Sequence, residues 1–323
     1  MNESAATGSQ RLRVLFMGTP ALATPTLAAV AAAHDLVAVV TQPDRPAGRG
    51  RVRVASPVRE WARQTDVPVL RPERVRDARA IEAVAATRPD VAVVVAYGQI
   101  LPAAILDIPR LGCVNLHASL LPRHRGASPI QASILAGDAH SGVTTMLMDE
   151  GLDSGPILQQ RRVRLTTDET AGTLGARLGA IGAELMVETL SRLAAGTLEP
   201  IAQDPTAATM TRLIKKQDGE IDWRMNATAI DRLVRAMQPW PVAYTRCGDE
   251  RFKVWAVEAA GQRTSMPPGT VIAGGTQLVV ACGESGTLRV LEMQRAGGRR
   301  MPVAELLRGH PIEVGRAMGD SGQ

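Results

Sequence analysis

Short apolar runs alternate with helical patterns along the first part of the chain. Residues 13–17 form an apolar run, 24–33 are rich in alanine and helical in character, and 36–41 form a second apolar run. A strand, a helix and a strand in this order predict a βαβ unit, the repeating element of parallel sheets.

The same alternation continues to about residue 194. Helical patterns occupy 57–64 and 78–86, whereas 90–96 and 111–116 are largely apolar runs. Such runs are typical of strands covered on both faces of a parallel sheet. Further strands are expected at 67–70, 142–148 and 157–165, and a helix around Leu174, Leu178, Ile181 and Leu185. This part is therefore predicted to be α/β, with a Rossmann-like, mostly parallel sheet.

The pattern changes near residue 197, where a polar stretch without periodicity runs to about residue 215. One helix is then expected at 227–236, followed by short β-like runs with glycine-rich turns, at 252–257, 270–273, 278–282 and 287–293. Short strands of this kind predict a small β-barrel. The expected organisation is an α/β domain over 1–196, a linker over 197–215 and a barrel domain over 216–323.

Composition is that of an ordinary folded protein, since 45% of the 323 residues are hydrophobic. The three cysteines, Cys113, Cys247 and Cys282, are widely separated, so neither a disulfide nor a metal site is expected. The aromatic residues of the carboxyl-terminal part are expected to lie mostly in its core. No apolar run has the length of a membrane span, and the first ten residues are small and polar, so we expect a cytoplasmic protein.

Positive charge is concentrated in one segment. The net charge is +5, and between residues 41 and 57 Arg45, Arg49, Arg51 and Arg53 face a single acidic residue. Two glycines among them predict a mobile basic loop beside strand ends, suited to phosphate contacts. Aromatic residues are only 2% of the chain, so base stacking is expected to contribute little.

Two common cofactor motifs are absent from the sequence. The turn at 18–20 follows a strand, but it lacks the glycine spacing that lets a backbone approach a dinucleotide. No Walker-type phosphate loop is present either. Neither a nicotinamide cofactor nor ATP hydrolysis is therefore expected.

Three polar residues have the composition of a proton-transfer site. Asn115 and His117 lie two residues apart at the end of an apolar run, so their side chains share one face of a strand. Asp153 has to join them through the fold. An amide, an imidazole and a carboxylate are what acyl transfer to an amine needs, because an oxyanion must be stabilised and an amine proton moved.

These residues and their neighbours resemble the formyltransferases that use 10-formyltetrahydrofolate. That family carries an Asn-x-His on a strand, a following Ser-Leu-Leu-Pro loop, here 119–122, and a downstream Asp-x-Gly, here 153–155. Other segments resemble the members of the family that act on a charged tRNA: 41–50, 94–102, 221–223 and 239–241. The resemblance extends from residue 13 to about residue 311.

The resemblance implies formyl transfer from 10-formyltetrahydrofolate to the α-amino group of methionine on initiator tRNA, by a monomer without a metal or NAD. Asn115, His117 and Asp153 would be catalytic, with the formal base being either His117 or Asp153. The folate would contact Ser119, Leu120, Leu121 and Pro122 on one side and Tyr97, Gly98, Ile100 and Leu101 on the other. The barrel would be OB-like and help to hold the tRNA, whose expected contacts are Arg45, Arg49, Arg51, Arg299 and Arg300.

Two alternatives stay open at this point. A formyltransferase acting on an amino sugar nucleotide or a ribonucleotide amine would use the same chemistry, but it would leave the basic loop and the barrel unexplained. A non-enzymatic RNA-binding module would use both of these, but it would leave Asn115, His117 and Asp153 without a role.

Overall fold

The structure, a computed structural model, describes residues 11–47 and 52–319. Contacts within the chain divide it into two compact units. Among the described residues, the first unit contains those up to Pro129, His140–Val163 and Gly175–Thr211. The second contains Ile130–Ala139, Arg164–Leu174 and those from Arg212 onward. None of the helices in the described part of the chain is long and apolar enough to cross a membrane.

The first unit is built on a seven-stranded mixed sheet in the order β10-β9-β7-β6-β1-β2-β5. Its parallel strands are β1 (Arg13–Gly18), β2 (Asp35–Val40), β5 (Val69–Leu70), β6 (Val91–Val95) and β7 (Cys113–His117). Strand β9 (His140–Leu147) pairs antiparallel to β7, and β10 (Ile157–Arg164) forms the edge. The expected α/β class with a mostly parallel sheet is confirmed.

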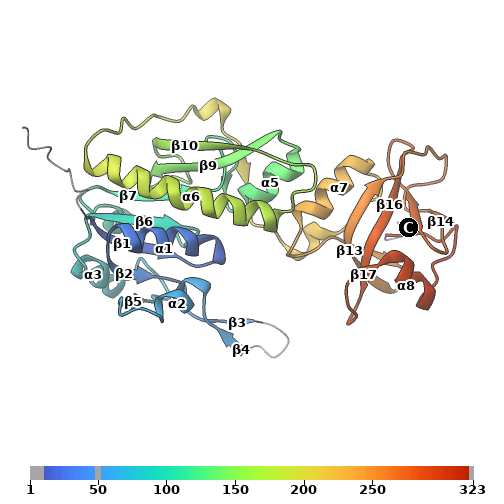
Figure 1. The fold of residues 1–323 in the computed structure, drawn as a ribbon, viewed down its shortest axis with the longest axis horizontal. Helices are drawn as coiled ribbons and strands as arrows, with labels where there is room; N and C mark the ends of the chain where they lie inside the picture. The colour runs from blue at the N-terminus through green and yellow to red at the C-terminus, as the bar shows by residue number, and fades with distance from the viewer. Residues whose placement is uncertain (1–10, 48–51, 320–323) are drawn as a thin grey trace, which may run out of the picture. The chain divides into compact units, whose positions relative to one another are not determined.

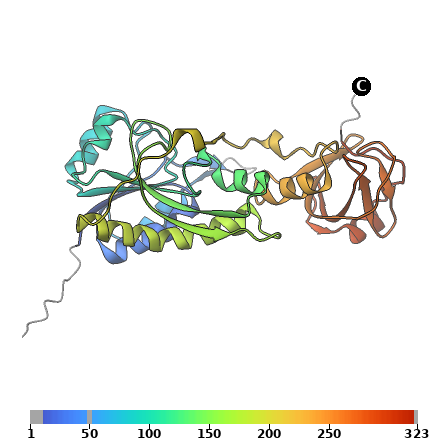
Figure 2. The same ribbon diagram turned by 90° about the horizontal axis from the view of Figure 1, so that it is seen from above.

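Helices cover both faces of this sheet. Helices α1 (Thr24–Ala33) and α6 (Ala171–Ala194) lie on one face, and α3 (Ala78–Ala86) and α4 (Ala103–Leu106) on the other (Figure 2). Helix α6 begins after Thr170, whose hydroxyl accepts a hydrogen bond from the backbone N–H of Thr173 at 3.2 Å. A side-chain oxygen at this position satisfies an amide that the helix itself leaves unpaired.

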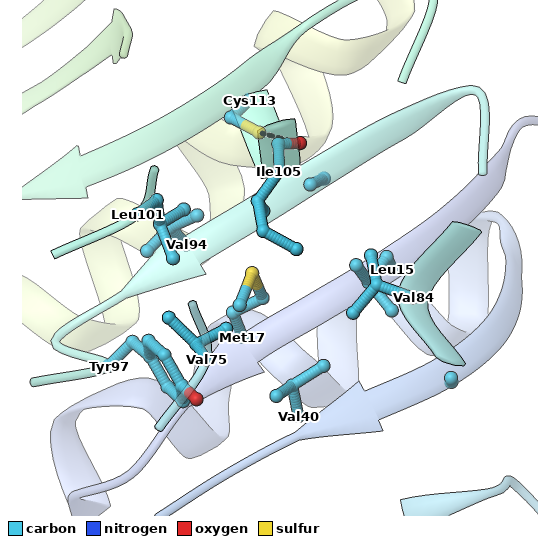
Figure 3. Close-up of a cluster of buried hydrophobic side chains, with 12 residues drawn as sticks. Leu15, Met17, Val40, Val75, Val84, Val94, Tyr97, Leu101, Ile105 and Cys113 are labelled. Carbon is cyan, nitrogen blue, oxygen red and sulfur yellow. Dashed lines mark hydrogen bonds between the residues drawn. The ribbon is translucent and has the colours of Figure 1, made fainter. Parts of the chain in front are cut away.

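The core under α3 and α4 consists mainly of aliphatic side chains, with Tyr97 and Cys113 among them. Leu15 and Met17 alternate with residues of the other sheet face, and they pack with Val40, Val94 and Ile105 (Figure 3). Each such side chain removed from water stabilises the fold by about 1.5–3 kcal/mol. This packing holds the parallel strands in register, so that their carboxyl ends form one edge.

The order of the strands reverses between β1 and β6. The chain adds β2 and β5 on one side of β1, then returns to add β6 and β7 on the other. Gly18 at the end of β1 pairs with Val95 at the end of β6. In open α/β sheets the connections diverge at such a point and leave a crevice at the carboxyl ends, where ligands bind.

The centre of the basic segment, where a mobile loop is expected, lies outside the described residues. Its described flanks are paired strands, β3 (Arg45–Ala47) and β4 (Val52–Val54), which form an antiparallel hairpin (Figure 1). The base of the hairpin is fixed because Asp44 forms ion pairs with Arg59 and Arg71. These two arginines hold the pKa of the Asp44 carboxyl below its usual range.

Helix α2 (Pro57–Ala62) follows the hairpin and is capped by Ser56, whose hydroxyl accepts from the backbone N–H of Arg59. The same hydroxyl lies 2.8 Å from that of Thr41, at the end of β2. The two ends of the segment are therefore joined beside the sheet.

The second unit is centred on a six-stranded antiparallel sheet that curls into a half-barrel, which confirms the small β domain expected from the sequence. The main path is β12 (Tyr244–Cys247), β13 (Glu250–Ala259), β16 (Thr287–Arg295), β15 (Leu278–Ala281) and β14 (Val271–Ala273), and β17 (Met301–Pro302) pairs with β16. The helices of this unit include α7 (Ala227–Ala236) and α8 (Val303–Gly309); α5 (Pro129–Ala136) also belongs to it except for Pro129.

Aromatic side chains of this unit are mostly buried, as expected. Trp223, Tyr244 and Phe252 are buried, and Trp255 is half-buried. Trp240 is the exception, because 51% of its surface is exposed. Four of the five aromatic side chains of this unit are thus buried or half-buried, in agreement with the expectation that most of them lie in the core.

Candidate functional site

Strand β7 carries Asn115 and His117 on the same face. Both side chains are buried. In the sheet, Asn115 lies beside Val94 of β6, and His117 lies beside Thr144 of β9. They are therefore held near the carboxyl end of β7, one strand away from the point where the strand order reverses.

The connection between β9 and β10 brings Asp153 to both residues. Its Oδ1 accepts from Asn115 Nδ2 at 3.5 Å, and its Oδ2 lies 3.6 Å from His117 Nδ1. The same Oδ2 accepts from the backbone N–H of Gly126 at 2.8 Å. The structure thus brings together the three residues that the sequence singled out, across 38 positions between Asn115 and Asp153.

The backbone around Asp153 explains the glycine two residues later. Asp153 itself has a φ of +52°, in the left-handed region. A Cβ at Gly155 would lie only 1.9 Å from the carbonyl oxygen of Leu147. The connection can pass this close to β9 only if residue 155 has no side chain.

The imidazole of His117 has two different environments. Its Nε2 lies 2.9 Å from the carbonyl oxygen of His124. A carbonyl only accepts hydrogen bonds, so Nε2 carries the hydrogen and Nδ1, which faces Asp153, is left as the acceptor of the neutral ring. Burial lowers the pKa of His117 below its ordinary value, and the charge of Asp153 offsets part of this effect. The ring is therefore neutral at pH 7 and able to accept a proton at Nδ1.

The Ser119 to Pro122 loop follows β7 directly, and its backbone is held from inside the unit. Thr144 donates to the carbonyl of Ser119 and accepts from the N–H of Leu121, and Gln160 donates to the carbonyl of Leu121. The Leu121 side chain is buried, with 3% of its surface exposed. Leu120 is half-buried and packs on Gly142. The loop is thus a rigid support beside His117.

The segment from Tyr97 to Leu101 follows β6, the strand that lies next to β7 in the sheet. The Tyr97 ring is in the core beside Val40 and Val75 (Figure 3), and burial raises its pKa to about 12. Leu101 is also in that core. Gly98 has a φ of +87°, and the next apolar side chain, Ile100, is 83% exposed. Of the side chains expected here to contact a ligand, Ile100 is therefore the one that faces outward.

The five arginines expected to contact phosphate have different surroundings. Arg45 is exposed and donates to the neutral amide of Gln42 at 3.1 Å. Arg49 and Arg51 lie outside the described residues. In the second unit Arg299 is paired with Glu305, and Arg300 is paired with Glu292 and lies over the Trp255 ring.

The sequence reasoning missed a segment that packs against the site. Residues 203–211 lie in the expected linker, yet β11 (Met210–Thr211) pairs in parallel with β8 (Arg125–Gly126). The hydroxyl of Thr209 accepts from the N–H of His124. Two-residue strands have no hydrophobic period, so nothing in the residue pattern indicated this pairing.

Comparison with known proteins gives the class first. The chain matches the profile of the formyl transferase domain over residues 11–190 and that of the formyl transferase C-terminal domain over residues 213–311. Among solved structures, HypX from Aquifex aeolicus in complex with tetrahydrofolic acid has a TM-score of 0.63 at 14% identity, covering 92% of this chain and 47% of that one. An N-formyltransferase from Helicobacter canadensis, solved with folinic acid and dTDP-3-aminofucose, has a TM-score of 0.63 at 16% identity, covering 88% and 100%. At these identities the likeness concerns the fold.

Curated relatives are far more similar. The methionyl-tRNA formyltransferase of Lachnospira eligens is 45% identical over 96% of this chain and 100% of its own length. That of Roseiflexus sp. is 47% identical over 96% of this chain and 96% of its own. The chain therefore belongs to the formyltransferases and, within them, to the methionyl-tRNA formyltransferase family.

Proposed function

We propose that the protein transfers the formyl group of 10-formyltetrahydrofolate to the α-amino group of methionine on initiator tRNA, supplying the formylated initiator for translation. The observation that carries this proposal is the convergence of Asn115, His117 and Asp153 near the strand ends, in a chain that belongs to this family. No metal enters the proposal.

Formyl transfer begins when the amine nitrogen attacks the formyl carbon, which gives a tetrahedral intermediate with an oxyanion. Asn115 Nδ2 has two hydrogens, and the contact with Asp153 uses one of them. The second hydrogen is available to the oxyanion. Loss of a donor of this kind raises the barrier of an acyl transfer by about 3 kcal/mol or more.

The attacking nitrogen becomes positively charged and has to lose a proton. In this proposal His117 Nδ1 accepts that proton, because Nε2 is already donating to His124. The Asp153 carboxylate, 3.6 Å from Nδ1, stabilises the imidazolium that results. The proton then passes to N10 of the folate as the bond between N10 and the formyl carbon breaks, which leaves tetrahydrofolate and the formylated amine.

The folate would lie in the crevice between the ends of β1 and β6 and beside β7. Exposed Ile100 and half-buried Leu120 are apolar surfaces suited to its pterin and aromatic ring. Ser119, Leu121 and Pro122 on one side, and Tyr97, Gly98 and Leu101 on the other, would act through the backbone that shapes these walls.

The anionic tRNA would contact the basic segment through Arg45, Arg49 and Arg51. Arg299 and Arg300 of the second unit would join them by exchanging their acidic partners for phosphates. In this proposal residues 1–196 form the catalytic domain and residues 216–323 form a second domain that contacts the tRNA. Residues 197–215 are the linker between these two domains. We also propose that the protein acts in the cytoplasm as a monomer, since one chain supplies Asn115, His117 and Asp153.

The test is formyl transfer from 10-formyltetrahydrofolate to charged initiator tRNA by the purified protein and by its His117→Ala variant. We expect transfer by the wild type and a loss of orders of magnitude in the variant. If the formyl group were transferred to an amino sugar nucleotide and not to the tRNA, the proposed reaction would stand but the proposed acceptor would be wrong. If the protein bound tRNA tightly but transferred no formyl group to either acceptor, the proposal that it is an enzyme would be wrong.

A further inference from the structure

Gln203 uses its whole side-chain amide to join two loops of the site. Its Nε2 donates to the backbone carbonyls of Asp153 at 2.9 Å and Gly155 at 2.7 Å. Its Oε1 accepts from both Nε and one terminal nitrogen of Arg125, at 3.1 and 2.8 Å. An amide has two donor hydrogens and two acceptor lone pairs, so each of them has a partner.

The two loops joined in this way determine where the Asp153 carboxylate lies. One loop carries Asp153, whose backbone lies in the left-handed region. The other carries Gly126, whose N–H donates to Asp153 Oδ2, and His124, whose carbonyl fixes the His117 ring. A shift between the loops would change both the contact of Asp153 with Gly126 and its distance from His117.

The surrounding chain holds Gln203 against these loops. Downstream of it, Thr209 accepts from the N–H of His124, and its carbonyl accepts from the N–H of Arg125. Thr211 donates to the carbonyl of Arg125 at 3.0 Å. The segment is therefore bonded to the backbone on both sides of the Arg125 side chain that Gln203 binds.

We infer that Gln203 is a positioning residue for formyl transfer, which acts by holding the Asp153 loop at the distance from His117 that the reaction needs. The inference rests on the proposed function. It means that the segment 203–211 affects the rate of the chemical step, although it carries none of the reactive groups. Gln203 does not contact the reacting atoms, so it affects the rate through Asp153.

The variants are chosen to separate positioning from stability. Gln203→Met keeps the length of the side chain and removes the whole amide. Gln203→Glu keeps an acceptor for Arg125 but loses both donors to the Asp153 loop. Gln159→Met is the matched control, because Gln159 also bonds through its amide, to Glu188 and Thr189, on the side of β10 that faces α6.

For both Gln203 variants we expect kcat to fall by about 10- to 100-fold, since a displacement of about 1 Å at a reacting group costs up to this factor. The KM values for folate and tRNA should stay within about twofold. In Gln203→Met the acidic limb of the kcat profile should move to lower pH, because an Asp153 carboxylate displaced from His117 no longer favours the protonated ring. Gln159→Met should leave kcat and the profile unchanged.

Several results would overturn the inference while the wild type still transfers formyl groups. They are a Gln203→Met variant with the kcat of the control, a loss confined to KM, and a fall in the kcat of Gln203→Met with no movement of its acidic limb. If both Gln203 variants failed to fold while Gln159→Met folded, Gln203 would be a structural residue and the inference would be wrong. A wild type without formyl transfer would instead overturn the proposed function itself.

Discussion

At the scale of single residues, the two nitrogens of His117 differ because of what each one faces. The carbonyl of His124 determines that Nε2 keeps its hydrogen. Asp153 faces Nδ1, the nitrogen that is left to accept a proton. Burial lowers the pKa of the ring and keeps it neutral in the range where a cell works. The same histidine on an exposed strand would be protonated in part of its molecules near pH 6.5.

The pH dependence of the rate follows from this environment. A lowered pKa means that the neutral imidazole persists to lower pH than usual, so kcat should stay constant down to about pH 6.5 and fall only below it. Formyl transfer measured between about pH 5 and 8 checks this expectation. An acidic limb centred at or above pH 6.5 would contradict the assignment of His117 as the proton acceptor.

The Asp153→Asn variant provides a second test of this pH dependence. The substitution removes the charge that raises the pKa of His117, so the acidic limb should move to still lower pH. The turnover rate should fall by orders of magnitude while folate still binds, because the imidazolium loses its carboxylate. Near-normal turnover would remove Asp153 from the chemistry.

Ile100 allows the folate wall to be tested without disturbing the fold. Ile100→Ser removes an apolar surface from an exposed side chain, so the melting temperature should not change. If the folate covers this residue, the loss of about 1–1.5 kcal/mol of apolar contact should raise the KM for 10-formyltetrahydrofolate by about tenfold. Val314→Ser, which alters another exposed apolar residue, is the control and should leave this KM unchanged.

A substitution at Leu121 is less suitable for testing whether the folate contacts this wall. Its side chain is buried beside the loop backbone that Thr144 and Gln160 hold. A carboxylate there would cost several kcal/mol of folding free energy, and a loss of folate binding would then report unfolding.

At the scale of elements, the site depends on short pairings more than on its long strands. Strands β8 and β11 have two residues each, yet they connect the His124 backbone, the Gly126 N–H and the segment that carries Gln203. Their close approach depends on Gly126, which has a φ of +107° and whose Cβ would lie 2.4 Å from the carbonyl oxygen of Thr211.

Gly126→Ala should therefore separate β8 from β11. We expect a loss of about 1–3 kcal/mol in the free energy of unfolding and a fall in kcat of at least about tenfold as the Gly126 N–H moves away from Asp153. Denaturant unfolding and the transfer assay measure the two effects.

Gly196→Ala is the matched control for this substitution. Gly196 also has a positive φ, of +65°, but, its two chain neighbours aside, no described residue has an atom within 4 Å of its Cβ position. The free energy of unfolding of Gly196→Ala should fall by about 1 kcal/mol because of backbone strain alone, and its kcat should not change. Equal losses of activity in the two variants would show that the pairing of β8 with β11 does not serve the site.

The elements themselves were predicted from the sequence where local signals were strong. Helices α1, α3 and α7 begin and end where their patterns do, since periodicity and capping are properties of neighbouring residues. The short elements β3, β4 and α8 were not expected. A hairpin of three-residue strands is stabilised by contacts such as those of Asp44 with Arg59 and Arg71, which a local pattern does not contain.

At the scale of the whole molecule, the net charge of +5 is less informative than the partners of each arginine. Arg45 lies on the hairpin and contacts the neutral Gln42, whereas Arg299 already has Glu305. A cation paired with an acid contributes less to the attraction of an anion than one that donates to a neutral group.

Arg45→Ala should therefore weaken tRNA binding more than Arg299→Ala. The KM for charged tRNA should rise, and the slope of log KM against log salt should decrease by about 1 between about 50 and 200 mM salt. For Arg299→Ala we expect a smaller change in both quantities. A larger effect from Arg299 would show that the ion pair with Glu305 opens when tRNA binds.

The sequence by itself determined the α/β class, the small β domain, and the chemical groups that the site needs. These follow from periodicity and residue type, which act over a few neighbouring positions. Tertiary structure alone decided which nitrogen of His117 is available, that the Tyr97 side chain belongs to the core, and that Gln203 holds the Asp153 loop. Each of these depends on hydrogen bonds or packing between residues far apart in the chain, and only the folded backbone determines their distances and directions.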